Sequence, residues 1–206
     1  MLSSYANLYT MSSIPSDTRT RILASALKLL EGKRGAMVRM SDIAKQAGVS
    51  RQALYLHFKS RTELLVAATR YIDEVKNIDE RLLLSRTTNS GIERLEAFIE
   101  AWGNYIPEIY GMGRALMAAK DTDDAAAQAW DGRMDAVRQG CKAAVYALQQ
   151  DNELAATFST KQATDILWTL LSVRNWEQFT VECGWSQKKY IETITALAKR
   201  SLVADH

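Results

Sequence analysis

Residues 39–61, Arg-Met-Ser-Asp-Ile-Ala-Lys-Gln-Ala-Gly-Val-Ser-Arg-Gln-Ala-Leu-Tyr-Leu-His-Phe-Lys-Ser-Arg, contain the most informative pattern in the chain. Apolar residues recur at helical spacing before Gly48 and predict a short helix over residues 41–47. Gly48 suits the left-handed backbone that often follows a helix. Ser50 is a good N-cap for a second helix over residues 51–58. The stretch therefore predicts two short helices joined by a tight turn.

The second of these helices is expected to have one buried side and one exposed side. Leu54 and Phe58 lie four positions apart and form its apolar side. The side chains left to face outward are Arg51, Gln52, Ala53, Tyr55 and His57. Ser60 with Glu63 three residues later has the pattern of a capping box, which predicts a third helix starting near Arg61.

The outward residues have the chemistry needed to read double-stranded DNA. A helix fits the major groove, and its first turn reaches the base edges. Arg51 can bind guanine through two hydrogen bonds, Gln52 can do the same with adenine, and the Ala53 methyl suits the methyl group of thymine. Polar and basic residues nearby suit phosphate oxygens. The candidate DNA contacts are Arg39, Met40, Ser41, Arg51, Gln52, Ala53, Tyr55, His57, Lys59 and Arg61.

One run of residues resembles a known family. The run is Ile43-Ala44…Ala47-Gly48-Val49-Ser50…Leu54-Tyr55…His57-Phe58-Lys59-Ser60-Arg61…Glu63-Leu64-Leu65, and it resembles the DNA-binding domain of the TetR family of transcriptional repressors. The similarity is dense over residues 17–66. Arg39 departs from the Thr that is usual in the family, so Ser41 is expected to cap the helix instead. Leu56 departs from a position that is often polar or aromatic.

Composition predicts an all-α protein. The chain of 206 residues is 47% hydrophobic and contains only two prolines and ten glycines, while helix-forming residues are abundant. We expect about nine helices in three parts. These are an N-terminal arm over residues 1–15, a helix-turn-helix DNA-binding domain over residues 16–62, and a C-terminal effector-binding and dimerisation domain over residues 63–206.

The remaining helices are placed by apolar periodicity and by helix-breaking residues. The predicted helices outside the central motif cover residues 16–32, 61–85, 91–106, 108–120, 121–150, 160–182 and 186–202. Pro107 is expected to form a boundary or a kink, because it lacks an N–H and clashes with the preceding turn. The last two helices carry more apolar residues than one core needs, and the resemblance implies that they form a four-helix bundle with a second copy of the chain.

Charge is unevenly distributed along the chain. Residues 16–65 contain ten basic and four acidic side chains, and the net charge of this segment is +6. The whole chain has a net charge of +2 and residues 1–15 carry none, so residues 66–206 carry −4. This is the distribution expected of a nucleic-acid-binding domain joined to a domain that does not bind nucleic acid.

Several other classes of function are disfavoured. The only histidines are His57 and His206, and Cys141 and Cys183 lack metal or redox spacing, so we expect no catalytic residues, no metal site, no cofactor and free thiols. No glycine-rich phosphate loop is present. The chain has no secretory signal and no apolar run near 18 residues, which predicts a cytoplasmic protein that does not bind membranes.

Aromatic and methionine residues in the C-terminal part form a candidate effector pocket. The residues are Trp102, Tyr105, Met112, Met117, Trp130, Tyr146, Trp168 and Trp176. Such side chains suit a small apolar or aromatic molecule. Each of them could instead belong to the core or to the dimer interface.

The favoured function is a TetR-type repressor that binds a palindromic operator as a homodimer and is released by a small molecule. An activator or a ligand-independent DNA-binding regulator is the alternative, and an enzyme is disfavoured by the missing catalytic groups. In a dimer, the two reading helices must lie about 34–36 Å apart, or a multiple of that, to enter successive major grooves.

Overall fold

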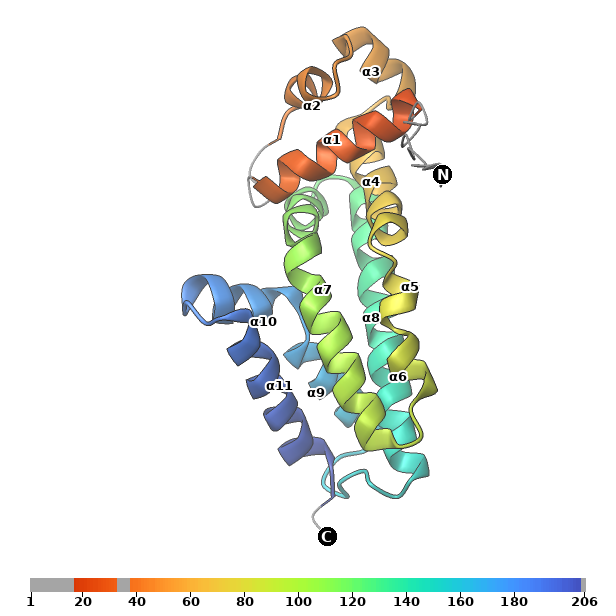
Figure 1. The fold of residues 1–206 in the computed structure, drawn as a ribbon, viewed down its shortest axis with the longest axis vertical. Helices are drawn as coiled ribbons and strands as arrows, with labels where there is room; N and C mark the ends of the chain where they lie inside the picture. The colour runs from red at the N-terminus through yellow and green to blue at the C-terminus, as the bar shows by residue number, and fades with distance from the viewer. Residues whose placement is uncertain (1–16, 33–37, 205–206) are drawn as a thin grey trace, which may run out of the picture.

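A computed structural model describes residues 17–32 and 38–204. The predicted N-terminal arm, residues 1–15, lies outside them. The all-α prediction is confirmed (Figure 1), since the only extended pairing among the described residues is an isolated bridge between Leu154 and Val203. The helices are α1 (Thr18–Gly32), α2 (Met40–Gln46), α3 (Arg51–His57), α4 (Arg61–Val75), α5 (Ile78–Arg81), α6 (Leu83–Thr87), α7 (Gly91–Ala119), α8 (Asp124–Gln150), α9 (Thr160–Leu170), α10 (Val173–Glu177), a π-helical turn (Gln178–Glu182) and α11 (Gln187–Leu202).

The first three helices lie together at one end of the molecule (Figure 1). Helix α1 packs against α2 and α4, and α2 packs against α3. Their buried side chains include Ile22, Leu23, Ala26, Leu30, Ile43, Ala44, Leu54, Phe58, Leu64 and Leu65. The predicted bounds of α1, α2 and α3 agree with the structure to within two residues.

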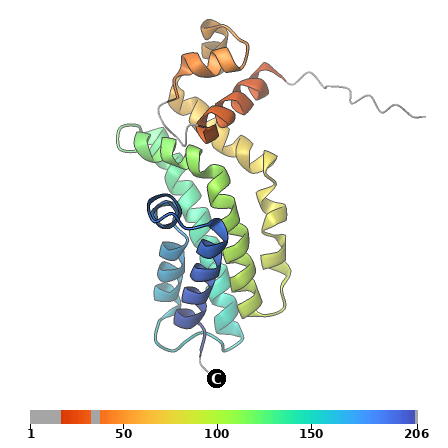
Figure 2. The ribbon, with the colours of Figure 1, turned by 60° about the vertical axis from the view of Figure 1, so that its left-hand side comes forward.

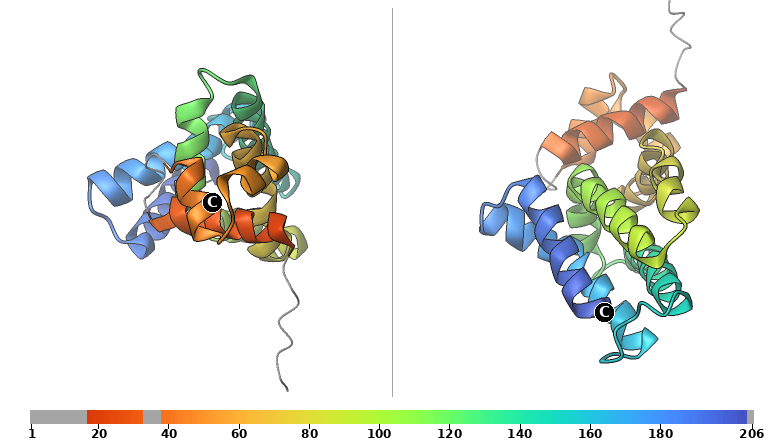
Figure 3. Two further views of the ribbon diagram at one scale, coloured as in Figure 1. Left: turned by 90° about the horizontal axis from the view of Figure 1, so that it is seen from above. Right: turned by 60° about the horizontal axis from the view of Figure 1, so that its bottom comes forward.

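Helix α7 is the central helix of the C-terminal part. It packs against α8, α6, α4 and α11, and α9 packs against α8. Two views of the ribbon place α4–α6 on one side of α7 and α9–α11 on the other (Figures 1 and 2). From above, α1–α3 lie over one end of this bundle (Figure 3). The predicted helices over residues 121–150 and 186–202 correspond to α8 and α11.

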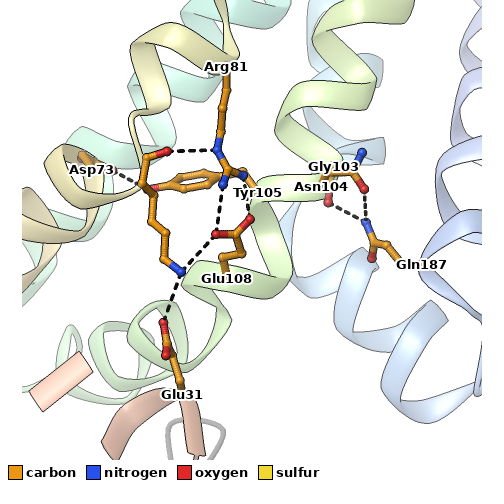
Figure 4. Close-up of polar contacts among 9 residues, drawn as sticks. Glu31, Asp73, Arg81, Gly103, Asn104, Tyr105, Glu108 and Gln187 are labelled. Carbon is orange, nitrogen blue, oxygen red and sulfur yellow. Dashed lines mark hydrogen bonds and ion pairs between the residues drawn. The ribbon is translucent and has the colours of Figure 1, made fainter. Parts of the chain in front are cut away.

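The predicted single helix over residues 61–85 is wrong, because the chain breaks into α4, α5 and α6. Asn77 has φ +49°, a left-handed conformation that Asn tolerates better than most residues. Polar contacts hold this break (Figure 4): the Arg81 Nε donates to the Lys76 carbonyl oxygen at 3.0 Å, and its guanidinium donates to Glu108 at 2.6 and 3.2 Å. The Lys76 ammonium lies 3.2 Å from the same carboxylate.

The division into two helices at Pro107 is also wrong, because α7 is continuous through this residue. A proline inside a helix leaves the carbonyl four residues earlier without its usual N–H donor. Here that carbonyl belongs to Gly103, and it accepts a hydrogen bond from the Gln187 side chain at 2.9 Å (Figure 4). The side chain of Gln187 therefore replaces the missing helical hydrogen bond, which explains why the helix tolerates the proline.

The predicted helix over residues 160–182 is divided in the structure. Ser172 caps α10 by accepting from the Asn175 N–H, so the chain turns after α9. Side chains satisfy the carbonyls at the end of α9: the Trp102 indole donates to Leu171 at 3.0 Å, and the Asn175 amide donates to Thr169 at 2.5 Å. These partners lie far away in sequence or beyond the break, so apolar periodicity alone missed the division.

Candidate nucleic-acid interface and internal cavity

The turn between α2 and α3 is fixed by backbone hydrogen bonds. The Val49 N–H donates to the Ala44 carbonyl at 3.0 Å, and the Gly48 N–H donates to the Lys45 carbonyl at 3.2 Å. This pair of bonds, with Gly48 at φ +65°, is a Schellman motif. The Ser50 hydroxyl then accepts the Ala53 N–H at 3.0 Å and caps α3. The sequence thus fixes the angle at which α3 leaves the turn.

Helix α3 has the two sides that its sequence predicts. Leu54, within α3, and Phe58, its C-cap residue, are fully buried. Arg51 and Gln52 are exposed in the first turn, and Tyr55 is 38% exposed one turn later. The Arg51 guanidinium lies over the Tyr55 ring at 5.6 Å. The remaining candidates on α3, Ala53 and His57, are half-buried.

Arg19 holds the C-terminal end of α3, and Arg61 holds the start of α4. Arg19 of α1 donates to the His57 carbonyl oxygen at 3.1 Å, and its guanidinium stacks on the Phe58 ring at 4.3 Å. Arg61 is half-buried and donates from its Nε to the Val38 carbonyl at 3.2 Å. Sequence reasoning missed the role of Arg19, since its partners lie almost forty residues away. Lys59 is exposed beside this end of the helix.

The start of α2 requires two corrections. Met40 was predicted to contact DNA, but its side chain is only 8% exposed because it packs into the core beneath α2, so we withdraw it. Ser41 was expected to replace the usual cap. Instead Arg39 is the N-cap residue, and its N–H donates to the Asp42 carboxylate at 3.2 Å. Arg39 and Ser41 are both exposed.

A cavity of about 660 Å³ lies between α4, α5 and α6 on one side and α7 and α8 on the other. This volume is within the usual range for sites that hold small molecules. Four of the predicted pocket residues line it, namely Trp102, Tyr105, Met112 and Trp130.

Four other predicted pocket residues do not line this cavity. Tyr146 is 49% exposed on the surface of α8, and Met117 packs against the core elsewhere on α7. Trp168 lies beneath the Arg138 guanidinium at 5.3 Å. Trp176 packs on the Tyr110 ring at 4.9 Å and borders a second, smaller pocket. They are therefore removed from the candidate lining.

An ion pair crosses the cavity wall between α4 and α8. The Arg133 guanidinium binds Asp73 through both carboxylate oxygens, one at 2.7 Å, and also donates to the Thr69 carbonyl at 3.1 Å. The Tyr105 hydroxyl of α7 donates to the same carboxylate at 2.8 Å. Burial, with the neighbouring Asp73, raises the pKa of Tyr105, so its hydroxyl remains a donor. Three helices thus meet at one carboxylate.

Comparison with known proteins agrees with this arrangement. The family described as "Bacterial regulatory proteins, tetR family" matches residues 22–68. The nucleoid occlusion factor SlmA of Marinomonas sp. is 32% identical, covering 52% of this chain and 54% of that protein. The regulator EthR of Mycobacterium tuberculosis is 30% identical, covering 55% of this chain and 53% of that protein. Residues 22–68 therefore carry the DNA-binding domain of the TetR family.

Solved structures share the fold along almost the whole chain. A transcriptional regulator from Saccharomonospora viridis, solved in complex with choline, has a TM-score of 0.78 at 19% identity over 91% of this chain and 98% of that one. A TetR regulator from Haloarcula marismortui has a TM-score of 0.72 at 17% identity over 91% and 99%. In sequence, however, the chain spans only about half the length of SlmA and EthR.

The matched family is described as bacterial regulatory proteins, and the relatives FasR and EthR are named transcription regulators. Cys141 and Cys183 are both free thiols, as predicted, and burial raises the pKa of Cys141 to about 12. No described helix is long and apolar enough to span a membrane.

Three contacts join the N-terminal helices to the cavity-bearing part. The Thr62 hydroxyl, in the first turn of α4, donates to Asp123 at 2.5 Å, and Asp123 caps α8. Glu31 of α1 lies 3.9 Å from the Lys76 ammonium (Figure 4). An added Cβ at Gly111 of α7 would lie 2.3 Å from the Leu30 carbonyl oxygen of α1. Helix α1 is thus in contact with α7 and with the end of α4.

Proposed function

We propose that this protein is a TetR-family repressor that binds a palindromic operator as a homodimer and is released by a small molecule. The observation that carries the proposal is the exposed first turn of α3, where Arg51 and Gln52 stand free of the protein core on a helix fixed by its neighbours. Operator binding would place the protein with the cellular DNA in the cytoplasm.

The DNA contacts are assigned by exposure and chemistry. Arg51, Gln52 and Ala53 would read base edges. Tyr55, His57, Lys59 and Arg61, with Arg39 and Ser41 at the start of α2, would bind phosphate oxygens. Arg61 already donates to Val38, so its share of phosphate binding would come from its remaining N–H groups.

The homodimer is assigned to the C-terminal helices α9 and α11. Leu197 on α11 is 40% exposed, and Ile166, Trp168 and Leu170 on α9 are half-buried rather than buried. Partly exposed apolar side chains on adjacent helices favour a second copy of the chain, which would bury the same patch on both subunits. The division into a DNA-binding domain over residues 16–62 and an effector-binding and dimerisation domain over residues 63–206 belongs to this proposal.

Release from DNA would follow from ligand binding in the cavity. Helix α4 forms part of the cavity wall, follows α3 directly in the chain and packs against α1. A small molecule that binds better to a conformation with the wrong spacing of the two α3 helices would lower operator occupancy by a population shift. The choline bound to the structural relative from Saccharomonospora viridis shows that a protein of this fold takes up a small organic molecule.

An activator is the second candidate, because the relative FasR of Mycolicibacterium smegmatis, 34% identical over 95 residues, is named a transcriptional activator. Transcription in vitro from a template that carries the bound site separates the two. Repression predicts fewer transcripts when the protein is added, and recovery when a cavity ligand follows. An increase in transcripts would favour the activator, and an effect that no cavity ligand reverses would contradict release by a small molecule.

A further inference from the structure

The charged side chains of the cavity wall include more cations than anions. They are Arg70, Arg86, Arg94 and Arg133, against Asp73 and Asp79. Both aspartates already have cationic partners: Asp73 binds Arg133, and Asp79 accepts from Arg86 at 3.0 Å. Among the residues that the structure describes, the wall therefore has no free carboxylate to offer a cation and has two arginines in excess.

Of the two arginines in excess, Arg94 is the better placed to bind a ligand. Arg70 is exposed, whereas Arg94 is half-buried in the first turns of α7. Within the described residues, no carboxylate lies within ion-pair distance of the Arg94 guanidinium, and no carbonyl accepts from it. A guanidinium that has lost part of its water and has no protein partner favours an anion, and its planar donors match a carboxylate.

Beyond Arg94, the side of the wall formed by α7 is mostly apolar, and the Tyr105 hydroxyl is already bonded to Asp73. Along α7 it continues through Phe98, Trp102, Ile109, Met112 and Leu116. The indole nitrogen of Trp102 is already bonded to Leu171, so Trp102 offers the cavity only apolar surface. Two helical turns separate Arg94 from Trp102, a distance of about 12 Å along the axis. A molecule that uses both features has one acidic end and an extended apolar body.

We propose that the cavity binds an apolar organic acid, with its carboxylate at Arg94 and its hydrocarbon body along α7 towards Trp102. The proposal deepens the proposed function, because it names the chemical class of the effector for the same cavity. A cation of the same shape would meet the excess of arginines, and a neutral molecule would leave Arg94 without a partner.

The test compares three probes with hydrocarbon chains of nine or ten carbons and different head groups: decanoate, decanol and decyltrimethylammonium. Isothermal titration calorimetry measures their affinity for the full-length protein below their micelle concentrations. We expect decanoate to bind about tenfold or more tightly than the other two. Arg94→Gln should remove this preference and leave the affinity for decanol unchanged, whereas Arg94→Lys should keep part of it.

Lys142→Gln is the matched control, because Lys142 is an exposed cation on α8 that does not line the cavity. It should leave all three affinities unchanged. Equal binding of decanoate and decanol, no binding of decanoate, or a preference that survives in Arg94→Gln would overturn the proposal. Circular dichroism confirms that each variant is folded.

The same samples separate this proposal from the proposed function. If decanoate binds through Arg94 but does not release DNA, the ligand class holds and release by this ligand fails. If decanoate does not bind and another class of compound releases DNA through the cavity, the ligand class fails and the proposed function holds.

Discussion

At the residue scale, the proposed function assigns base reading and phosphate binding to different exposed side chains around α3. Arg51→Ala or Gln52→Ala should relax base preference at one position of each half-site by about 1–3 kcal/mol. Lys59→Ala should weaken binding to all sequences alike and lower the salt dependence by about one phosphate contact. Fluorescence anisotropy on a panel of single-base operator variants at several salt concentrations measures both effects.

Lys142→Ala on α8 is the control for this series and should change neither quantity. The assignments would be contradicted if Arg51→Ala weakened all sequences equally and Lys59→Ala changed the base preference. Arg61 is a poorer probe than Lys59, because its bond to the Val38 carbonyl means that replacing it also removes a structural contact.

A second residue-scale prediction concerns acid stability at Glu108. Burial alone would raise the pKa of Glu108, but hydrogen bonds from Arg81 and Lys76 outweigh it and hold the pKa below its usual value. The carboxylate therefore stabilises the fold at pH above its unfolded pKa of about 4.3, and this contribution is lost as pH falls through the lower folded pKa. Glu108→Gln should be less stable than the wild type near neutral pH, with the difference shrinking in acid.

Thermal unfolding followed by circular dichroism from about pH 7 to about pH 3 measures this difference. Glu80→Gln, at an exposed carboxylate of α5, should follow the wild type at every pH. A gap between the wild type and Glu108→Gln that stays constant over the whole range would show that Arg81 and Lys76 do not stabilise the charged form.

At the element scale, α7 depends on a distant side chain. Gln187→Leu leaves the buried Gly103 carbonyl without a donor and should cost about 1–3 kcal/mol of unfolding free energy. Pro107→Ala restores a backbone N–H that can bond to Gly103. In the Pro107→Ala background, Gln187→Leu should lower the unfolding free energy by about 1 kcal/mol less than it does in the wild type. A double-mutant cycle by chemical denaturation measures this difference. The same cost in both backgrounds would contradict our account of Pro107.

The elements also show what sequence can and cannot predict. Helices α2 and α3 were predicted almost to the residue, because Gly48 and Ser50 act on the backbone within their own turn. The continuity of α7 was not, since it depends on Gln187, some eighty residues away. The break at Asn77 had a weak local signal, because Asn tolerates a left-handed backbone. The contacts with Glu108 that hold the break had no local signal in the sequence.

The candidate site could also be predicted from sequence only in part. The exposure of Arg51 and Gln52 follows from helical spacing beside Leu54 and Phe58, so the exposed face of α3 could be predicted. The cavity could be predicted only in part, because an aromatic residue gives no sign of whether it faces a cavity, the core or solvent. The ion pair between Asp73 and Arg133 joins residues sixty positions apart, and neither has a local feature that marks it.

At the scale of the whole molecule, the N-terminal helices contact the C-terminal part where α1 packs against α7. Gly111→Ala would place a methyl group against the Leu30 carbonyl, and backbone cannot yield as a flexible side chain can. We expect a loss of about 1–3 kcal/mol in chemical denaturation. Gly132→Ala is the matched control, since open space surrounds it within α8, and it should gain about 0.5–1 kcal/mol. Equal stability of the two variants would contradict this docking.

The whole account depends on two copies of α3 presenting Arg51 and Gln52 to successive major grooves of one duplex. Selection of bound sites from a pool of random DNA measures this directly, because the enriched sequences show both the half-site and its spacing. We predict two inverted half-sites whose centres lie about 10–10.5 base pairs, or a multiple, apart. In Gln52→Ala the preference should relax at one position of each half-site. Enrichment of a single unrepeated site, or of no sequence at all, would contradict the account.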